Sequence, residues 1–434
     1  MPKLAFRPQQ IVAGFRLKGR VHLKAWPAGS PRQGAGLGLV QLLTSSELAR
    51  TVAVFGALRL RSGSMQNQIL EVLRTVNDPD LKRDLVSLGM IQDLRCEDGV
   101  VSFRLVLTTP ACPMKEMMER ECREKISKIA GVRQVKIQMD AQVKRSAQGS
   151  AQPSGAQSIE GVKHIIAVSS GKGGVGKSTI AVNLALSLAI EGARVGIMDA
   201  DVYGPNLPTM LGVTEDPLLE QHPQKGEVFI PPTAHGIKVM SMGFLVKGDQ
   251  PMVWRGPMLH SVVNQFCHKV NWGDLDYLVV DMPPGTGDVQ LSLSQLVPVS
   301  GVVMVTTPQE VSMQDVRKAV LMFEKVRIPI LGIVENMSWF EVPSPSGVPE
   351  RHYLFGKDGG KLLAEKYRTE LLAQVPLVQR VREGGDSGKP VVVAEPTHAV
   401  AQTLRQLARK VAQQISIRTE AGAGEPLVQI GRFT

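Results

Sequence analysis

The stretch Ser169-Ser170-Gly171-Lys172-Gly173-Gly174-Val175-Gly176-Lys177-Ser178-Thr179 decides the fold of this chain. It directly follows the apolar run His164 to Val168 and leads into residues 180–190, whose apolar positions have helical spacing. Glycines between a strand and a helix let consecutive backbone N–H groups face phosphate oxygens, and the helix adds the positive end of its dipole. The sequence therefore predicts a phosphate-binding loop.

Two nucleotide-binding patterns overlap in this loop. Gly171, Gly173 and Gly176 satisfy the dinucleotide pattern GxGxxG, and the same stretch satisfies GxxxxGK[ST]. Lys177 and Ser178 favour the second pattern, because a nucleoside triphosphate needs a lysine on its terminal phosphates and a hydroxyl on its Mg²⁺ ion. The predicted nucleotide-binding residues of the loop are Gly171, Lys172, Gly173, Gly174, Val175, Gly176, Lys177, Ser178 and Thr179.

The positive charge of the chain is concentrated at its beginning. The 434 residues carry a net charge of +10, and residues 1–64 contain ten Lys and Arg side chains against Glu47 alone. Because the remainder is nearly neutral, the charge does not indicate nucleic-acid binding, and we expect no nucleic-acid partner. Residues 1–64 are irregular and can be a transit segment, a basic disordered arm, or upstream sequence from an early start codon, which we favour slightly.

Apolar runs and cysteines restrict the cellular setting. No run approaches the roughly 18 apolar residues that a membrane-spanning helix needs, so we expect no transmembrane segment. The four cysteines have no pairing rhythm, which favours a reducing compartment over a disulfide framework. We therefore expect a cytoplasmic protein.

Composition divides the rest of the chain into parts. Residues 65–142 are predicted to form a small α+β domain, and residues 143–160, rich in Ser, Gln, Gly and Ala, a flexible linker. The order expected in the small domain is helix Ile69 to Val76, strand Val100 to Leu107, helix Cys112 to Ile129 and strand Val132 to Met139.

Residues 161–415 alternate apolar strand-like runs with segments of helical spacing, and residues 416–434 form a tail. This alternation predicts an α/β domain, a mostly parallel P-loop NTPase sheet with helices on both faces. Its ligand is expected at the carboxyl ends of the strands. The predicted strands are Ile165 to Val168, Val195 to Met198, Ile237 to Met240, Tyr277 to Val280, Val302 to Val305, Ile330 to Val334 and Leu371 to Val375.

Aspartates end two of these strands. Asp199-Ala200-Asp201 follows residues 194–198, and Asp281 follows residues 276–280. Apolar residues closing on an aspartate are typical of a Walker B element, whose carboxylate holds Mg²⁺ directly or through water. A strand-end aspartate can also cap a turn or a helix, but two of them in one P-loop chain favour the metal site. We predict Ser178 and Asp281 as the Mg²⁺ ligands.

Lys172 makes the loop KGGxGKS, and these residues resemble the deviant P-loop ATPases of the MinD and ParA type. The resemblance implies that Lys172 reaches the partner's phosphates across a nucleotide-sandwich homodimer and stabilises the transition state. A solvated lysine beside an anionic ligand is the alternative. The resemblance also implies that Asp201 orients the attacking water and that Asn336 contacts adenine, although Asn336 is equally typical of a turn. Gly285, in a proline-stiffened loop after Asp281, is predicted to present its N–H to the γ-phosphate.

Further stretches narrow the resemblance to the Mrp (ApbC) family of iron-sulfur cluster carrier ATPases, over about residues 65 to 412. Residues 65–142 resemble the metal-sulfur cluster biosynthesis domain often fused ahead of this ATPase. The family implies a cytoplasmic, magnesium-dependent ATPase that exchanges iron-sulfur clusters between cluster scaffold proteins and apo iron-sulfur proteins. The stretches are DVYGPN at 201–206, WRGP at 254–257, DMPPGTGD at 281–288, ENMS at 335–338 and REGGDSGKP at 382–390, with DPD at 78–80, LGM at 88–90 and TTPACP at 108–113 in the small domain.

Cysteine usage departs from the family in one respect. Many members carry a CPxC pair shortly after ENMS, but residues 338–347 of this chain contain no cysteine, and serine is a poor ligand for iron. Cys112 is then the leading candidate for a cluster ligand, because a position ahead of a helix would lower its pKa and favour the thiolate. A small buried cysteine is the alternative, Cys267 is a distant second candidate, and an ATPase that binds no cluster also remains open.

A different class of protein fits part of the sequence. A MinD or ParA-like positioning ATPase would bind membrane or DNA through its dimer, and Ala399 to Ile415 has an apolar stripe that suits a membrane-surface helix. Such a stripe more often packs on its own domain. The TTPACP stretch favours the carrier, since a positioning ATPase has no need of it.

Overall fold

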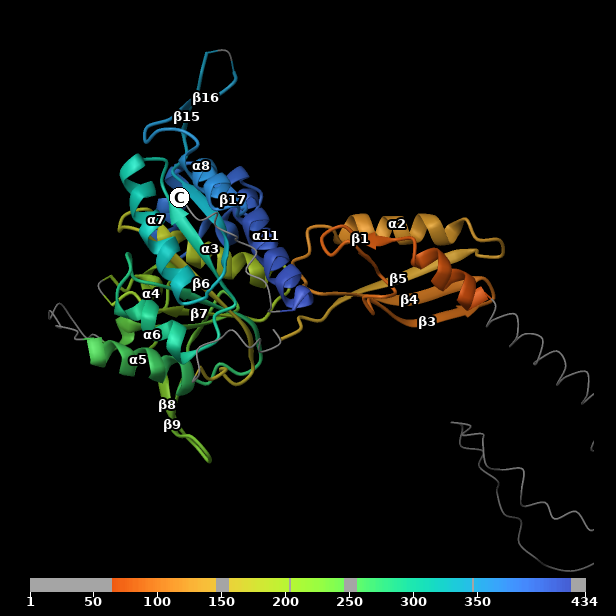
Figure 1. The fold of residues 1–434 in the computed structure, drawn as a ribbon, viewed down its shortest axis with the longest axis horizontal. Helices are drawn as coiled ribbons and strands as arrows, with labels where there is room; N and C mark the ends of the chain where they lie inside the picture. The colour runs from red at the N-terminus through yellow and green to blue at the C-terminus, as the bar shows by residue number, and fades with distance from the viewer. Residues whose placement is uncertain (1–64, 146–155, 203, 246–255, 346, 423–434) are drawn as a thin grey trace, which may run out of the picture. The chain divides into compact units, whose positions relative to one another are not determined.

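The computed structural model describes residues 65–145, 156–202, 204–245, 256–345 and 347–422 (Figure 1). The predictions made for residues 1–64, for most of the linker and for residues 423–434 lie outside the described residues. Within them, the chain forms a small α+β domain and a larger α/β domain, and each is described by itself.

The larger domain is built on an eight-stranded sheet. Its order is β10-β11-β7-β12-β6-β13-β14-β17, and every pair is parallel except β10 with β11. All seven predicted strands belong to this sheet, which confirms the predicted fold class. The strands are β6 (Val162–Ser170), β7 (Val195–Asp199), β10 (Thr233–Ala234), β11 (Ile237–Ser241), β12 (Leu275–Asp281), β13 (Gly301–Thr306), β14 (Ile330–Asn336) and β17 (Leu371–Val375).

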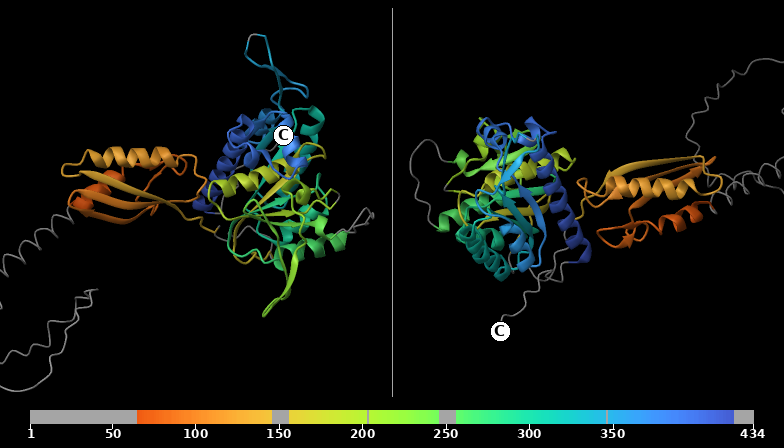
Figure 2. Two further views of the ribbon diagram at one scale, coloured as in Figure 1. Left: turned by 180° about the vertical axis from the view of Figure 1, so that it is seen from behind. Right: turned by 90° about the horizontal axis from the view of Figure 1, so that it is seen from above.

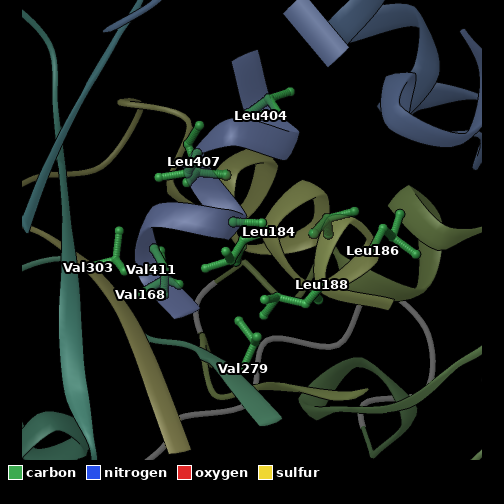
Figure 3. Packing of buried hydrophobic residues seen from close by; sticks show 14 of the residues in the cluster. Val168, Leu184, Leu186, Leu188, Val279, Val303, Leu404, Leu407 and Val411 are labelled. Atoms are coloured by element: carbon green, nitrogen blue, oxygen red, sulfur yellow. The ribbon is translucent and has the colours of Figure 1, made fainter. Parts of the chain in front are cut away.

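Helices cover both faces of this sheet. Along β6, Ile166 and Val168 pack into one hydrophobic cluster and Ile165 and Ala167 into another, as the alternation of side chains along a strand requires. The first cluster includes α3 (Lys177–Ile190), α4 (Leu207–Leu211), α10 (Val391–Ala394) and α11 (Ala399–Ala421), and part of it is drawn in Figure 3. The second includes α5 (Gly256–His268), α6 (Asp288–Leu296), α7 (Glu310–Lys325) and α8 (Gly359–Lys366).

The helix α11 settles two predictions. Its apolar stripe, which includes Leu404, Leu407 and Val411, is buried against α3, so this face is not available to a membrane (Figure 3). The helix continues to Ala421, and the boundary expected after residue 415 therefore falls inside it. None of the described helices has the length and hydropathy that crossing a membrane would require.

The small domain has three strands more than the two predicted. Its three-stranded sheet has the order β3-β4-β5, with β3 (Ile91–Glu97) antiparallel to β4 (Val100–Leu107) and β5 (Gln134–Ala141) parallel to β4. The missed strand β3 reaches β4 through Asp98-Gly99, both with positive φ (49° and 78°), the turn that a two-residue hairpin needs. Residues 65–73 are helical, α2 is Lys115–Ser127, and β1 (Asn77–Asp78) pairs with β2 (Arg83–Asp84).

Two exposed hairpins of the larger domain were not predicted. They are β8 (Leu218–His222) with β9 (Gly226–Ile230), and β15 (Phe340–Val342) with β16 (Glu350–His352). Both extend away from the body of the domain in Figures 1 and 2. The second hairpin begins within residues 338–347, which contain no cysteine. The remaining elements are the short helices η2 (Met242–Phe244) and α9 (Gln379–Asp386).

Candidate nucleotide site

The glycine-rich loop lies where the sequence predicts it, between β6 and α3. β6 ends at Ser170 and α3 begins at Lys177. Two glycines are fixed by their neighbours. A Cβ at Gly171 would lie 2.3 Å from the carbonyl carbon of Asp315 in α7, and one at Gly176, where φ is +81°, would lie 2.2 Å from Nδ2 of Asn336. No larger residue fits either position without a shift of backbone or of Asn336.

Lys177 is buried and bonded to acidic side chains. Its Nζ donates to Oδ1 of Asp281 at 2.7 Å, lies 3.4 Å from Oδ2 of Asp201, and contacts Oγ of Ser178 at 3.2 Å. The structure thus brings together four predicted site residues from β6–α3, β7 and β12. The lysine holds the position of a cation between two carboxylates.

A third buried carboxylate adjoins this group. Asp199 lies opposite Asp281 on the neighbouring strand, and burial followed by the charge of Asp281 raises the pKa of Asp199 to about 8. Hydrogen bonds from Ser241 Oγ (2.8 Å) and from the backbone N–H groups of Leu207 and Asp201 act in the opposite direction. Burial also raises the pKa of Asp281 despite its bond to Lys177. Burial thus disfavours the charged forms of both Asp199 and Asp281, and Lys177 is the cation that opposes this effect at Asp281.

Asp199 was not among the predicted site residues. Its carboxylate accepts hydrogen bonds from the backbone N–H groups of Asp201 and Leu207, so it anchors the segment that follows β7. The position of an aspartate at a strand end was the available signal, but that signal does not tell an anchor from a catalytic group.

Lys172 has a partner within its own chain. Its Nζ donates to Oε1 of Gln309 at 3.0 Å, directly ahead of α7. The side chain is partly exposed. The role of Lys172 across a dimer stays a prediction.

Two residues expected on the nucleotide bond to protein instead. The N–H of Gly285, where φ is +92°, donates to the carbonyl of Ser170 at 2.9 Å, so it does not present a free N–H. The Nδ2 of Asn336 donates to the carbonyl of Val175 at 2.9 Å, a bond that holds the glycine-rich loop. The roles of Gly285 and Asn336 on a nucleotide stay predictions.

Cys112 lies in the small domain, and the expectation of a low thiol pKa is wrong. The helix α2 begins at Lys115, three residues further on, and the cysteine is only 7% exposed. Burial raises the pKa of Cys112 to about 11, with smaller contributions from the charges of Asp78 and Asp80, against the lowering effect of the Met114 backbone and Lys115.

The other cysteines are also buried. Cys122 and Cys267 are fully buried, and burial raises the pKa of each to about 12. Cys267 lies in α5, as predicted. No three His, Cys, Asp or Glu side chains of the described ranges are placed to hold one metal ion.

Known proteins resemble both domains. Residues 161–412 match the family model described as NUBPL iron-transfer P-loop NTPase, and residues 66–138 match that of an iron-sulfur cluster assembly protein. The chain is 50% identical over 350 residues to a Synechocystis protein named iron-sulfur cluster carrier protein, covering 80% of this chain and 97% of the relative. It is 42% identical over 364 residues to the Escherichia coli protein of that name, covering 83% and 95%.

Solved structures also match. An ADP complex of a nucleotide-binding protein from Archaeoglobus fulgidus is 37% identical, covers 55% of this chain and 91% of its own, and has a TM-score of 0.47.

Proposed function

Because this chain belongs to the family of NUBPL iron-transfer P-loop NTPases, we propose that it is an ATP-hydrolysing iron-sulfur cluster carrier that works as a nucleotide-switched homodimer. The observation that supports this most directly is the contact of Lys177 with Asp281, Asp201 and Ser178 at the carboxyl end of the sheet. The apolar face of α11 is buried, so nothing in the described residues favours the membrane-positioning alternative.

Three residues are assigned to the hydrolysis step. Lys177 turns from Asp281 to the terminal phosphates of ATP, which have the larger negative charge. Asp201 orients the attacking water next to those phosphates, a role that its distance of 3.4 Å from Lys177 Nζ supports. Lys172 of the second copy adds positive charge to the transition state, after it has left Gln309 of its own chain.

Ser178 and Asp281 suit a magnesium ion. A hydroxyl and a carboxylate are the hard oxygen ligands that Mg²⁺ prefers, and the hydrogen bond from Ser178 is among the effects that lower the pKa of Asp281. Bound Mg²⁺ neutralises charge on the phosphates. Because Mg²⁺ takes its other ligands from water and phosphate, the site needs no third acidic side chain.

The cluster is the cargo, received from scaffold proteins and delivered to apo iron-sulfur proteins. The matches to proteins named iron-sulfur cluster carriers support this role, and Cys112 is the thiol we assign to it. With a pKa of about 11, Cys112 needs the iron itself to displace its proton. A homodimer supplies two such thiols, and other ligands must complete the set.

ATP turnover by the full chain tests the first half of the proposal. We expect Lys177→Ala to abolish Mg²⁺-dependent phosphate release, whereas Lys318→Ala, an exposed lysine on α7, leaves it unchanged. Equal turnover in wild type and Lys177→Ala would show that the glycine-rich loop does not hydrolyse ATP.

Anaerobic reconstitution with iron and sulfide tests the second half. We expect wild type and Cys122→Ala to bind iron and sulfide with a visible charge-transfer spectrum, and Cys112→Ala to lose both. Cys122 is the matched control, because it is buried in the same domain outside the TTPACP stretch. An unchanged spectrum in Cys112→Ala would exclude Cys112 as a ligand, and no cluster in any variant would leave ATP hydrolysis as the chemistry of this chain.

A further inference from the structure

The loop that follows Asp281 is held from two sides. On one side the N–H of Gly285 donates to Ser170 at the end of β6. On the other, Nε2 of Gln290 donates to the carbonyls of Pro283 (2.8 Å) and Gly285 (3.1 Å). Gln290 lies in the first turn of α6 and is fully buried. One side chain therefore ties two residues of the loop to a helix of the domain.

The other end of the same amide is unsatisfied. Oε1 of Gln290 is buried and has no hydrogen-bond partner within the described residues. A Cβ built on Gly287 would lie 3.7 Å from this oxygen, so it faces the end of the loop. An acceptor left unpaired inside a protein is costly, and a native structure that keeps one calls for a reason.

We propose that Gln290 is a positioning residue for ATP hydrolysis, which keeps the loop at 283–287 attached to α6 in both of its arrangements. In the arrangement seen here, its nitrogen holds Pro283 and Gly285. When Gly285 leaves Ser170 and turns its N–H towards the γ-phosphate, a backbone N–H near Gly287 bonds to Oε1. The inference rests on the proposed ATPase function, and it gives the unpaired oxygen a partner in the second arrangement.

The geometry accounts for the choice of glutamine at this position. The amide has a donor and an acceptor at one end of the side chain, so it can exchange carbonyls of the loop for an N–H without leaving α6. A side chain with only a donor or only an acceptor could bond to the loop in one of its two arrangements but not in the other. Two-state loops of this kind move between discrete packings rather than deforming gradually.

The test compares Gln290→Met with Ser294→Ala in the full chain. Methionine keeps the length of the side chain and removes donor and acceptor together. Ser294 is the matched control, because it is buried one turn further along α6 and bonds only to Leu291 of its own helix. For Gln290→Met we expect kcat for ATP to fall about tenfold or more, while the dissociation constant for ADP, which has no γ-phosphate, stays within about twofold.

Hydrogen exchange gives a readout that does not depend on turnover. We expect the amides of residues 285–287 to exchange about tenfold faster in Gln290→Met than in wild type, and unchanged in Ser294→Ala. If Gln290→Met does not fold, the same measurements can be made on Gln290→Ala, because this variant leaves a cavity but introduces no clash.

Each outcome decides between the claims. If Gln290→Met has the same ATP turnover and the same hydrogen-exchange rates as the wild type, the proposed role of Gln290 is wrong and the ATPase proposal is unaffected. Equal losses of ADP and ATP binding, with a lower melting temperature, would reduce Gln290 to a structural residue. If the wild type does not turn over ATP, the proposed ATPase function is wrong, and so is the role of Gln290 in hydrolysis. Hydrogen exchange at residues 285–287 would still show whether Gln290 holds the loop.

Discussion

The titration of His164 gives a quantitative test of the packing around β6. The imidazole is buried, its Nε2 is 2.7 Å from the carbonyl of Lys144, and its Nδ1 is 3.2 Å from Oγ of Ser300. Since a carbonyl only accepts, Nε2 carries the proton of the neutral ring. Burial lowers the pKa of His164 to about 4 from an ordinary 6.5, and the charges of Lys163 and Arg145 act in the same direction.

The sign and size of the effect follow from these values. Below about pH 6.5 the unfolded chain binds a proton at His164, whereas the folded chain binds none until about pH 4, so the free energy of unfolding falls as pH is lowered between them. At 1.36 kcal/mol per pKa unit, the full loss is about 3 kcal/mol, of which about 2 kcal/mol is lost by pH 5. Asp199, whose pKa is raised to about 8, contributes stability in the opposite direction.

The assay therefore compares wild type with His164→Gln, which keeps a donor and an acceptor, by urea unfolding followed by tryptophan fluorescence. The contribution of Asp199 is common to both proteins and cancels in their difference. We expect that difference to shift by about 2 kcal/mol between pH 7 and pH 5, in favour of His164→Gln at the lower pH. A difference that is the same at both pH values would refute the assignment of a neutral buried imidazole.

Three further predictions concern the loop and the core. Gly171→Ala should lower both stability and ADP affinity, because the new Cβ meets the backbone of Asp315, and calorimetry with ADP titration measures both. Leu407→Ala should lower the free energy of unfolding by about 3 kcal/mol, while Leu321→Ala, 49% exposed on α7, should stay within about 0.5 kcal/mol in the same urea series. Lys172→Ala should abolish ATP turnover and leave ADP binding unchanged, because Lys172 is proposed to act on the nucleotide that the partner subunit binds. Weaker ADP binding would instead show that Lys172 contacts the nucleotide of its own chain.

Strands buried on both faces were easier to predict from the sequence than strands with an exposed face. Strands buried on both faces are near-continuous apolar runs, and all seven of these were predicted because the packing that buries them also shapes their sequence. Among the strands that were not predicted, β3, β8 and β15 have at least one exposed face, so their sequences are mixed. For β3 a local signal did exist, the dipeptide Asp98-Gly99, whose positive φ angles form the hairpin turn.

The sequence predicted Lys177, Ser178, Asp201 and Asp281 for one site, where they do lie together, but it did not predict the bonds of the site. The family resemblance was confirmed, and the position of the loop between a strand and a helix follows from its glycines. Sequence patterns do not show which group satisfies Gly285 or Asn336, because that depends on loops far apart in the chain. For Cys112 the local motif suggested a thiolate, but burial outweighs the nearby backbone N–H and Lys115, and burial is a property of the whole fold.

If the chain binds ATP and Mg²⁺ as proposed, the bonds within the site predict that the two ligands bind as a linked pair. Lys177 reaches phosphate only by leaving Asp281, and its departure leaves a fully buried carboxylate without its cation, next to Asp199 on the adjacent strand. An unpaired buried charge on Asp281 is costly, so the contact with Lys177 adds little net binding free energy for a nucleotide that binds without metal. A divalent cation at Asp281 and Ser178 replaces the charge that Lys177 withdraws. When nucleotide binds without metal, we therefore expect the bonds of Lys177 to Asp281 and of Gly285 to Ser170 to stay intact. The loop that Gln290 holds should move to its second arrangement only when nucleotide and Mg²⁺ are both bound.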